Sequence, residues 1–203
     1  MDVAGIQNKL NAANYPVGAA DGALGPNTYA GIMNYVANRH AGSIAVALGQ
    51  AANADFAKYQ INTPLRMAHF LAQGCEETQY WQFFTELGDA NYFAKYDTMP
   101  GLGNTQPGDG FKYRGRGIFM ITGRYNYTQY AQKTGLDLVN HPELAADPVN
   151  AMTIACIFWN AHGCSALADN DDCLDITKKI NGGTNGLSVR QALTTKLKAL
   201  FGV

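Results

Sequence analysis

Two glutamates in the middle of the chain, Glu77 and Glu86, have the chemistry and spacing of an acid/base pair. Glu77 ends a stretch from Thr63 whose apolar residues recur at helical spacing behind a capping threonine and a proline. Glu86 follows nine residues later, and on one unbroken helix the two side chains would point to opposite sides. The chain must therefore turn between them if they share a site. Two carboxylates across a groove are the minimum equipment for general acid/base cleavage of a glycosidic bond.

A carboxylate pair of this kind is weak evidence alone, because charged residues near a helix end are usually just solvated. An aromatic run between the two glutamates could wall a groove; it comprises Tyr80, Trp81, Phe83 and Phe84. A functional site at these glutamates therefore requires further matching residues elsewhere in the chain.

Composition indicates a folded protein without a strong field. The 203 residues suit one substantial domain with a small appendage, and 47% apolar against 15% charged residues excludes a disordered chain. The net charge of -1 gives no whole-molecule attraction for nucleic acid or an anionic membrane. We therefore expect no nucleic-acid partner.

The N-terminal residues lack the basic start and apolar run of a secretory signal, and no later stretch reaches about 18 uninterrupted apolar residues. We expect synthesis in the cytoplasm without a signal peptide and no stable membrane insertion. Work outside the cytoplasm would then need a separate release step.

The cysteines and histidines show no metal-binding pattern. Cys75 and Cys156 lie in apolar helical surroundings typical of buried free thiols. Cys164 and Cys173 flank a polar loop, so a disulfide between them stays an alternative. The histidines lack HExxH or comparable spacing, and an acid, a base and water suffice for glycoside hydrolysis. We expect no metal and no organic cofactor.

Helical periodicity accounts for most of the chain. In the last predicted helix it places Leu193 and Leu197 inward and Arg190 and Thr194 outward. Residues 87–110 are rich in Gly, Pro and Asn and read as a functional loop, residues 118–121 as a short buried strand, and the aspartates of 169–175 as a solvated turn. The predicted helices cover residues 4–14, 26–36, 43–59, 63–77, 125–133, 148–162, 174–180 and 188–201.

The first forty residues form a helix, a glycine-rich turn and a second helix, and are too few to hold a core alone. Their pattern resembles the helical peptidoglycan-binding repeat found at the ends of many cell-wall hydrolases. The matching residues are Gln7, Leu10, Tyr15, Pro16, Gly18, Asp21, Gly22, Gly25, Pro26 and Thr28. We therefore expect residues 1–40 to be a short peptidoglycan-binding-like segment and residues 41–203 to be the catalytic domain.

The segment GDGFKYRGRGIFMITGRYNY alternates arginines with glycines that allow close backbone approach. It reads either as a structural turn or as the lining of a pocket, because its polar-tipped aromatic residues suit sugars.

Four features in unbroken order resemble family 19 glycoside hydrolases, the chitinase-like lysozymes, and most closely the compact phage endolysins. They are FLAQGCEET, the spacing to Glu86, the GDGFKYRGRGIFMITGRYNY segment and KINGG. The resemblance covers roughly residues 44 to 203 and implies an all-α fold of two lobes flanking a cleft.

The resemblance also implies residue roles. Glu77 matches the general acid, Glu86 the general base that activates water, and Thr122 the residue that helps hold this water. Arg190 matches an arginine of the last helix that pairs with the acid. Sugar-contacting positions fall on Tyr113, Tyr125, Asn126 and Asn181. Two positions depart from the family pattern, because Glu76 replaces a histidine and Met120 replaces a glutamine.

The expected function is an endolysin, a lysozyme-like muramidase that hydrolyses peptidoglycan β-1,4 bonds with inversion and lyses a phage's host. Inversion requires carboxyl groups about 6.5 to 9.5 Å apart, against about 5 to 5.5 Å for retention. The expected partner is the glycan strand of peptidoglycan, which the protein would reach in the periplasm. We expect the protein to be a monomer with antimicrobial activity. The alternatives are a chitinase and a non-catalytic wall-binding protein. The basic C-terminal helix is either a weak outer-membrane contact or a plain solvated face.

Overall fold

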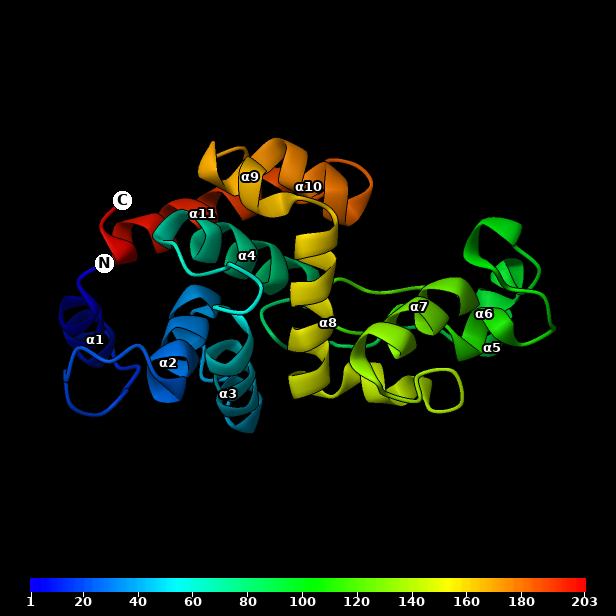
Figure 1. The fold of residues 1–203 in the computed structure, drawn as a ribbon, viewed down its shortest axis with the longest axis horizontal. Coiled ribbons are helices and arrows are strands. Elements are labelled where there is room, and N and C mark those ends of the chain that lie inside the picture. Colours follow the sequence, from blue (N-terminus) through cyan, green and yellow to red (C-terminus); the bar gives the residue numbers. More distant parts are fainter. The chain divides into compact units, whose positions relative to one another are not determined.

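Helices make up every regular element of the structure, a computed structural model that describes residues 1–203 (Figure 1). The only β-type pairings are two isolated bridges, Thr85 with Arg116 and Arg116 with Ile121. The expected all-α fold is confirmed. None of the helices combines the length and apolar character that a membrane crossing requires. The chain divides into two compact units, Met1–Gln82 with Cys156–Val203 and Phe83–Ala155, and the second of the two boundaries falls inside helix α8 (Pro148–Ala161).

The first unit is organised around α4 (Pro64–Glu77), which packs against α11 and, on another side, against α2. Thr63 caps α4 by accepting the Arg66 N–H at 3.3 Å, and Pro64 occupies the first turn. Every residue from Met67 to Cys75 is buried. The other helices of this unit are α1 (Val3–Ala12), α2 (Pro26–Ala37), α3 (Ser43–Asp55), α9 (Cys164–Asp169), α10 (Cys173–Asn181) and α11 (Leu187–Phe201).

The chain leaves α4 through a tight turn, as the spacing of the two glutamates required. Gln79, Tyr80 and Trp81 take positive φ angles of 48°, 63° and 62°, which are uncommon for residues other than glycine. The expectation that Trp81 walls a groove is wrong. Trp81 is fully buried in the first unit, and its indole N–H donates to the Met33 carbonyl at 2.9 Å. Burial of this large side chain anchors the turn.

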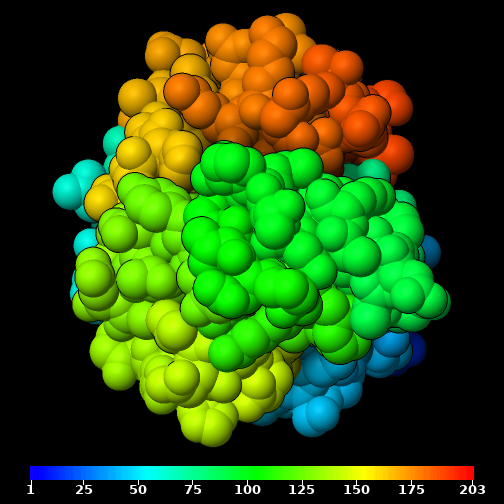
Figure 2. Space-filling view, turned by 90° about the vertical axis from the view of Figure 1, so that its right-hand side faces the viewer, coloured from blue at the N-terminus to red at the C-terminus, as the bar shows by residue number.

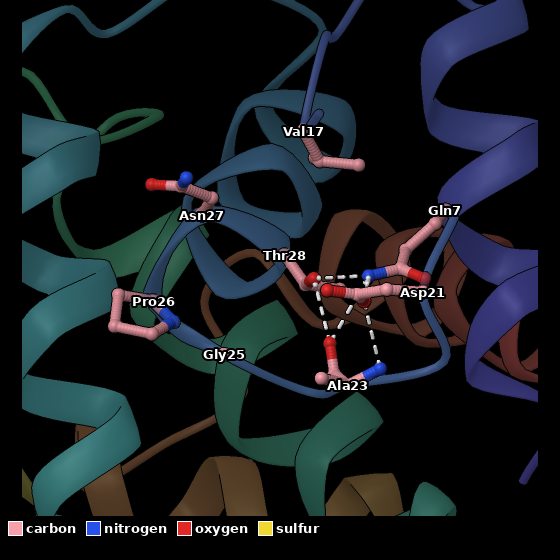
Figure 3. A pocket seen from close by; sticks show the side chains of 8 residues that line it. All are labelled: Gln7, Val17, Asp21, Ala23, Gly25, Pro26, Asn27 and Thr28. Carbon is pink, nitrogen blue, oxygen red and sulfur yellow. Dashed lines mark hydrogen bonds between the residues drawn. The ribbon is translucent and has the colours of Figure 1, made fainter. Parts of the chain in front are cut away.

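The first forty residues lie within the first unit, where α2 packs along α3. The loop between α1 and α2 closes around Gln7, whose buried amide donates to Asp21, the Ala23 carbonyl and Thr28 (Figure 3). Its carbonyl oxygen accepts the Gly22 N–H at 2.9 Å. These side chains border an open hollow of about 290 Å³, beside which Val17 and Pro26 lie. The segment is thus part of a larger core, which its own short length could not supply.

The second unit contains α7 (Arg124–Thr134), the first half of α8 and short helical pieces. The predicted 87–110 loop proves to hold α5 (Ala90–Phe93), η1 (Ala94–Tyr96), η2 (Pro100–Leu102) and the start of α6 (Asp109–Lys112), and η3 (Pro142–Ala146) follows later. Phe93 is the buried centre of this segment. In Figure 2 the segment, drawn in green, forms the face of the second unit toward the viewer.

The strand predicted for residues 118–121 is absent. Gly117 and Met120 take positive φ angles of 83° and 47°, and Arg116 and Ile121 exchange two backbone hydrogen bonds at 2.9 and 3.2 Å. The result is a closed turn whose Ile118 and Ile121 side chains are buried. Its apolar run therefore reflects burial, which periodicity alone cannot distinguish from a strand.

Asp109 braces the second unit internally. Its buried carboxylate binds the Arg124 guanidinium at 2.5 and 2.9 Å and accepts the N–H groups of Thr105 and Gln106. Burial by itself raises the pKa of this carboxyl, but the bonds from Arg124 and the two amides outweigh it and lower the pKa below 3.8. Asn104 adds a bond to the Arg124 N–H at 2.8 Å. The loop is thereby attached to the start of α7.

The aspartates near residue 170 differ from the expected solvated turn. Asp169 forms a two-pronged pair with Arg66, and Asp171 contacts both His69 and Lys198. All four cysteines are free and buried, so Cys164 and Cys173 do not form the disulfide that stayed open as an alternative. A short helix, α9, occupies most of the stretch between these two cysteines.

We predict that α2 contributes to the stability of the whole first unit. Ile32→Ala, at a fully buried position of α2, should lower the free energy of unfolding by about 2–5 kcal/mol through loss of packing. Val46→Ala, at a half-exposed position of α3, is the matched control and should change it by less than about 0.5 kcal/mol. Urea denaturation of the full chain measures both. Equal, small effects would contradict the packing of residues 1–40 into this core.

A second prediction concerns acid stability. Because the folded state lowers the Asp109 pKa, this group stabilises the fold above about pH 4, and the contribution is lost as pH falls further. Asp109→Asn should cost about 1–3 kcal/mol at pH 7, and the gap to the unchanged protein should narrow between about pH 4 and pH 2. Urea midpoints measured across this range give the result. Parallel pH curves for the two proteins would contradict the assignment.

Candidate active site

Glu77 is the last residue of α4 and forms a largely buried ion pair. The Arg190 Nη2 donates to Glu77 Oε1 at 2.5 Å, and the two side chains are 3% and 13% exposed. Asn181 Nδ2 lies 3.4 Å from the same oxygen. Both contacts therefore fall on Oε1, and Oε2 accepts neither of them. The pairing that the family resemblance implied for Arg190 is present in the structure.

Two glycine turns bring Asn181 and Arg190 to this carboxylate. Asn181 ends α10, where Gly182 takes a φ of 75°, and α11 begins after Gly186 with a φ of 70°. These left-handed positions favour glycine, which explains the first glycine of the NGG sequence and the glycine of the following turn. The helix pattern was wrong in placing Arg190 and Thr194 outward, since both are buried. Pairing with Glu77 is what allows the Arg190 charge to be buried.

Glu76, the departure beside Glu77, has different surroundings. Its carboxylate lies against the backbone of Gly186, where an added Cβ would come within 2.5 Å of Glu76 Oε1. Gly186 caps the N-terminus of α11, an end that favours negative charge. The two adjacent glutamates therefore serve different contacts, and the glycine leaves room for the first of them.

Glu86 belongs to the second unit and is held by the backbone of the RGRG turn. Its N–H donates to the Gly115 carbonyl at 2.8 Å, and the Gly115 N–H donates to its Oε2 at 3.1 Å. A Cβ at position 115 would lie only 3.0 Å from that oxygen, so glycine permits the approach. Burial lowers the pKa of the neighbouring Arg114, while the negative charge of Glu86 acts in the opposite direction.

Thr122 and Met120 lie in the turn that follows. The Thr122 hydroxyl donates to the Met120 carbonyl at 2.9 Å, which leaves its oxygen lone pairs as acceptors. Met120 approaches Gly115 closely, because a Cβ added there would lie 3.4 Å from the Met120 Cβ. The second departure from the family pattern thus borders the backbone that holds Glu86. Its thioether is a far weaker hydrogen-bonding group than an amide.

The expected sugar-contacting residues of the second unit divide into two kinds. Tyr125 is 59% exposed at the start of α7, and the adjacent Asn126 is half-buried and donates to the Thr122 carbonyl at 2.8 Å. Tyr113 corrects the expectation, because its ring is fully buried and its hydroxyl donates to the Val139 carbonyl at 3.0 Å. The Tyr113 side chain is a core residue with no surface to offer a sugar.

One buried polar residue near Glu77 was missed by the sequence reasoning. Gln73 lies one turn before Glu77 on α4, and its Oε1 accepts a bond from Arg190 Nη1 at 2.5 Å. The available signal was its spacing, because residues four apart on a helix share a face. No cluster of three or more His, Cys, Asp or Glu side chains is placed to hold a metal ion.

Comparisons with known proteins agree with this arrangement. The family model described as chitinase class I, of glycoside hydrolase family 19, matches residues 66–176. A glycosyl hydrolase family 19 domain-containing protein of Haemophilus influenzae is 31% identical over 170 residues, which cover 70% of this chain and 82% of that protein. An endochitinase of Arabidopsis thaliana is 33% identical over 135 residues, covering 66% of this chain and 45% of its own length.

The fold is also similar to that of chitinases of known structure. The crystal structure of chitinase C from Streptomyces griseus matches with a TM-score of 0.68 and 21% identity, covering 85% of this chain and 75% of that one. A sequence identity of 21% supports similarity of the fold alone. Membership of the family is supported by the family model, which matches more than half of the chain. The chain therefore belongs to glycoside hydrolase family 19 and is a chitinase-like glycoside hydrolase.

Proposed function

We propose that this chain is an endolysin that hydrolyses the β-1,4 bonds of peptidoglycan, with Glu77 as general acid and Glu86 as general base. The observation that carries the proposal is the contrast between the two carboxylates. Glu77 is held by charged and amide side chains, and Glu86 is held by the backbone of a glycine turn. Two carboxyl groups held by different partners suit separate acid and base roles.

The contacts of Glu77 fit a proton donor. Because Arg190 and Asn181 both address Oε1, the acidic proton belongs on Oε2, the oxygen that neither of them contacts. That oxygen then protonates the glycosidic oxygen as the bond breaks. Arg190 also stabilises the carboxylate that remains after proton transfer.

The contacts of Glu86 and Thr122 fit the activation of water. The Gly115 N–H occupies Glu86 Oε2, so Oε1 is the oxygen that receives a proton from the attacking water. The Thr122 hydroxyl hydrogen is directed at the Met120 carbonyl, so Thr122 serves as an acceptor for that water. Attack from the face opposite the leaving group inverts the anomeric centre. The carboxyl separation in a sugar-bound structure should be about 6.5 to 9.5 Å, and a separation near 5 Å would contradict inversion.

Peptidoglycan is the proposed substrate because of the N-terminal segment. Residues 1–40 lie ahead of the family match, carry the peptidoglycan-binding-like pattern and include Gln7 and Thr28, which border the open hollow. Tyr125, Asn126 and Asn181 are the proposed sugar contacts that remain after the correction of Tyr113. We further propose a monomer that is released to the periplasm to lyse the host.

Chitinase is the second candidate, because the similar plant protein is named an endochitinase. A non-catalytic wall-binding protein is the third candidate. Binding alone would not require two carboxylates positioned by separate hydrogen bonds, as Glu77 and Glu86 are. Contact of the C-terminal helix with the outer membrane stays a prediction. The pairing of Lys198 with Asp171, and of Arg190 with Glu77, leaves less free positive charge for it.

Glu77→Gln tests the acid role. The amide cannot donate the required proton, so the rate of glycan hydrolysis should fall at least about 100-fold while the melting temperature stays close to that of the unchanged protein. Glu76→Gln is the matched control, one residue away, and should keep most of the activity. Dye release from labelled peptidoglycan measures the rates. Full activity of Glu77→Gln would remove this residue from its role.

Substrate choice is tested by running two assays side by side. Turbidity of outer-membrane-permeabilised bacteria should fall rapidly with the full chain, and a soluble oligomer of N-acetylglucosamine should be cleaved much more slowly. Glu77→Gln should be inactive in both assays. Rapid cleavage of the oligomer without lysis would favour the chitinase, and activity in neither assay would favour the non-catalytic protein.

A further inference from the structure

Gln73 occupies a fully buried position between α4, α10 and α11, and both ends of its amide are bonded. Its Nε2 donates to Thr177 Oγ1 at 2.9 Å, with Cys173 Sγ at 3.8 Å. Its Oε1 accepts from Arg190 Nη1 at 2.5 Å. Burial of an amide is costly unless such partners are present, so each of these bonds contributes to holding the group in place.

The direction of this amide is set by Thr177, which is itself fully buried on α10. The Thr177 hydroxyl donates to the Cys173 carbonyl at 2.7 Å, so its single hydrogen is committed to the helix backbone. Toward Gln73 the Thr177 oxygen can then only accept. The Gln73 NH₂ must therefore face Thr177, and its carbonyl oxygen must face Arg190.

Arg190 consequently meets three acceptors, of which one is charged. Its Nε donates to the Asn185 carbonyl at 3.2 Å, Nη1 to the Gln73 carbonyl oxygen, and Nη2 to Glu77. The planar guanidinium is thus held along two edges by neutral oxygens. Its positive charge is left for a single carboxylate, the one assigned the proton.

We infer that Gln73 is a positioning residue for the general acid, and that Thr177, Gln73 and Arg190 form a directional hydrogen-bond relay that fixes Glu77 through Oε1. This inference rests on the proposed acid role of Glu77. The relay aligns the guanidinium, the guanidinium holds one carboxylate oxygen, and the other oxygen is kept for the substrate. An amide suits the middle of the relay because it carries no charge, whereas a carboxylate there would compete with Glu77 for Arg190.

The experiment compares three variants that nearly conserve volume. Gln73→Met removes both bonds of the amide, Thr177→Val removes the group that orients it, and Thr177→Ser keeps that hydroxyl while losing a methyl group. We expect kcat on solubilised peptidoglycan to fall about 10- to 100-fold in Gln73→Met, with KM changed less than about threefold, because a misplaced acid affects the chemical step more than binding. Thr177→Val should lose activity in the same manner, and Thr177→Ser should retain most of it.

Packing alone predicts the opposite order for the two Thr177 variants, because valine fills the site and serine leaves a small cavity. Nearly unchanged kcat in Thr177→Val together with a loss in Thr177→Ser would overturn the relay. If Gln73→Met fails to fold, the Thr177 pair still decides the outcome. Thermal melting of each variant shows whether the fold is kept.

A readout that does not depend on catalysis separates this inference from the proposed function. The Arg190 Nε–H resonance, assigned by its loss in Arg190→Met, should be sharp and exchange slowly with solvent in the unchanged protein and in Thr177→Ser. It should broaden or exchange faster in Gln73→Met and Thr177→Val. An unaltered resonance in Gln73→Met would overturn the relay. Altered resonances without any glycan hydrolysis by the unchanged protein would instead contradict the proposed function.

Discussion

The ion pair between Arg190 and Glu77 is the constraint on which the first unit depends. It joins α4 to α11, helices more than a hundred residues apart in sequence, and both side chains are largely buried. Burial of a guanidinium is costly unless its nitrogens find acceptors, and Asn185 and Gln73 accept from the two nitrogens of Arg190 that do not contact Glu77. The same ion pair therefore holds α4 against α11 and fixes the orientation of the Glu77 carboxylate.

The second unit places its carboxylate by a different means. Glu86 is attached to the Gly115 backbone in both directions, and the Asp109 pair with Arg124 keeps the nearby loop on α7. The hydrogen bonds that position Glu86 come from the backbone, although the charged side chain of Arg114 lies nearby. Under the proposed roles, the neutral backbone contacts suit Glu86 as the base, and the Arg190 cation suits Glu77 because it stabilises the carboxylate left after proton donation.

The two departures from the family pattern have local explanations in the structure. Glu76 lies against Gly186 at the start of α11, so its charge meets a helix N-terminus and Glu77 keeps Arg190. Met120 stands beside Gly115, and its carbonyl, which any residue could supply, receives the Thr122 hydroxyl. Neither change removes a contact that the structure uses to hold a carboxylate.

The sequence by itself determined the longer helices, the turn after Glu77 and the family, because capping, periodicity and motif order can be read along the chain, whereas the short helices α5, α6 and α9 were not predicted. Thr63 begins α4 as its type predicts. Only the tertiary structure decided which side chains are buried, since burial depends on segments distant along the chain. Trp81 and Tyr113, expected to line a groove or contact sugar, are core residues, and Arg190, expected to face outward, is buried. A helix pattern counts a guanidinium as polar and places it outside, but a buried carboxylate reverses that preference.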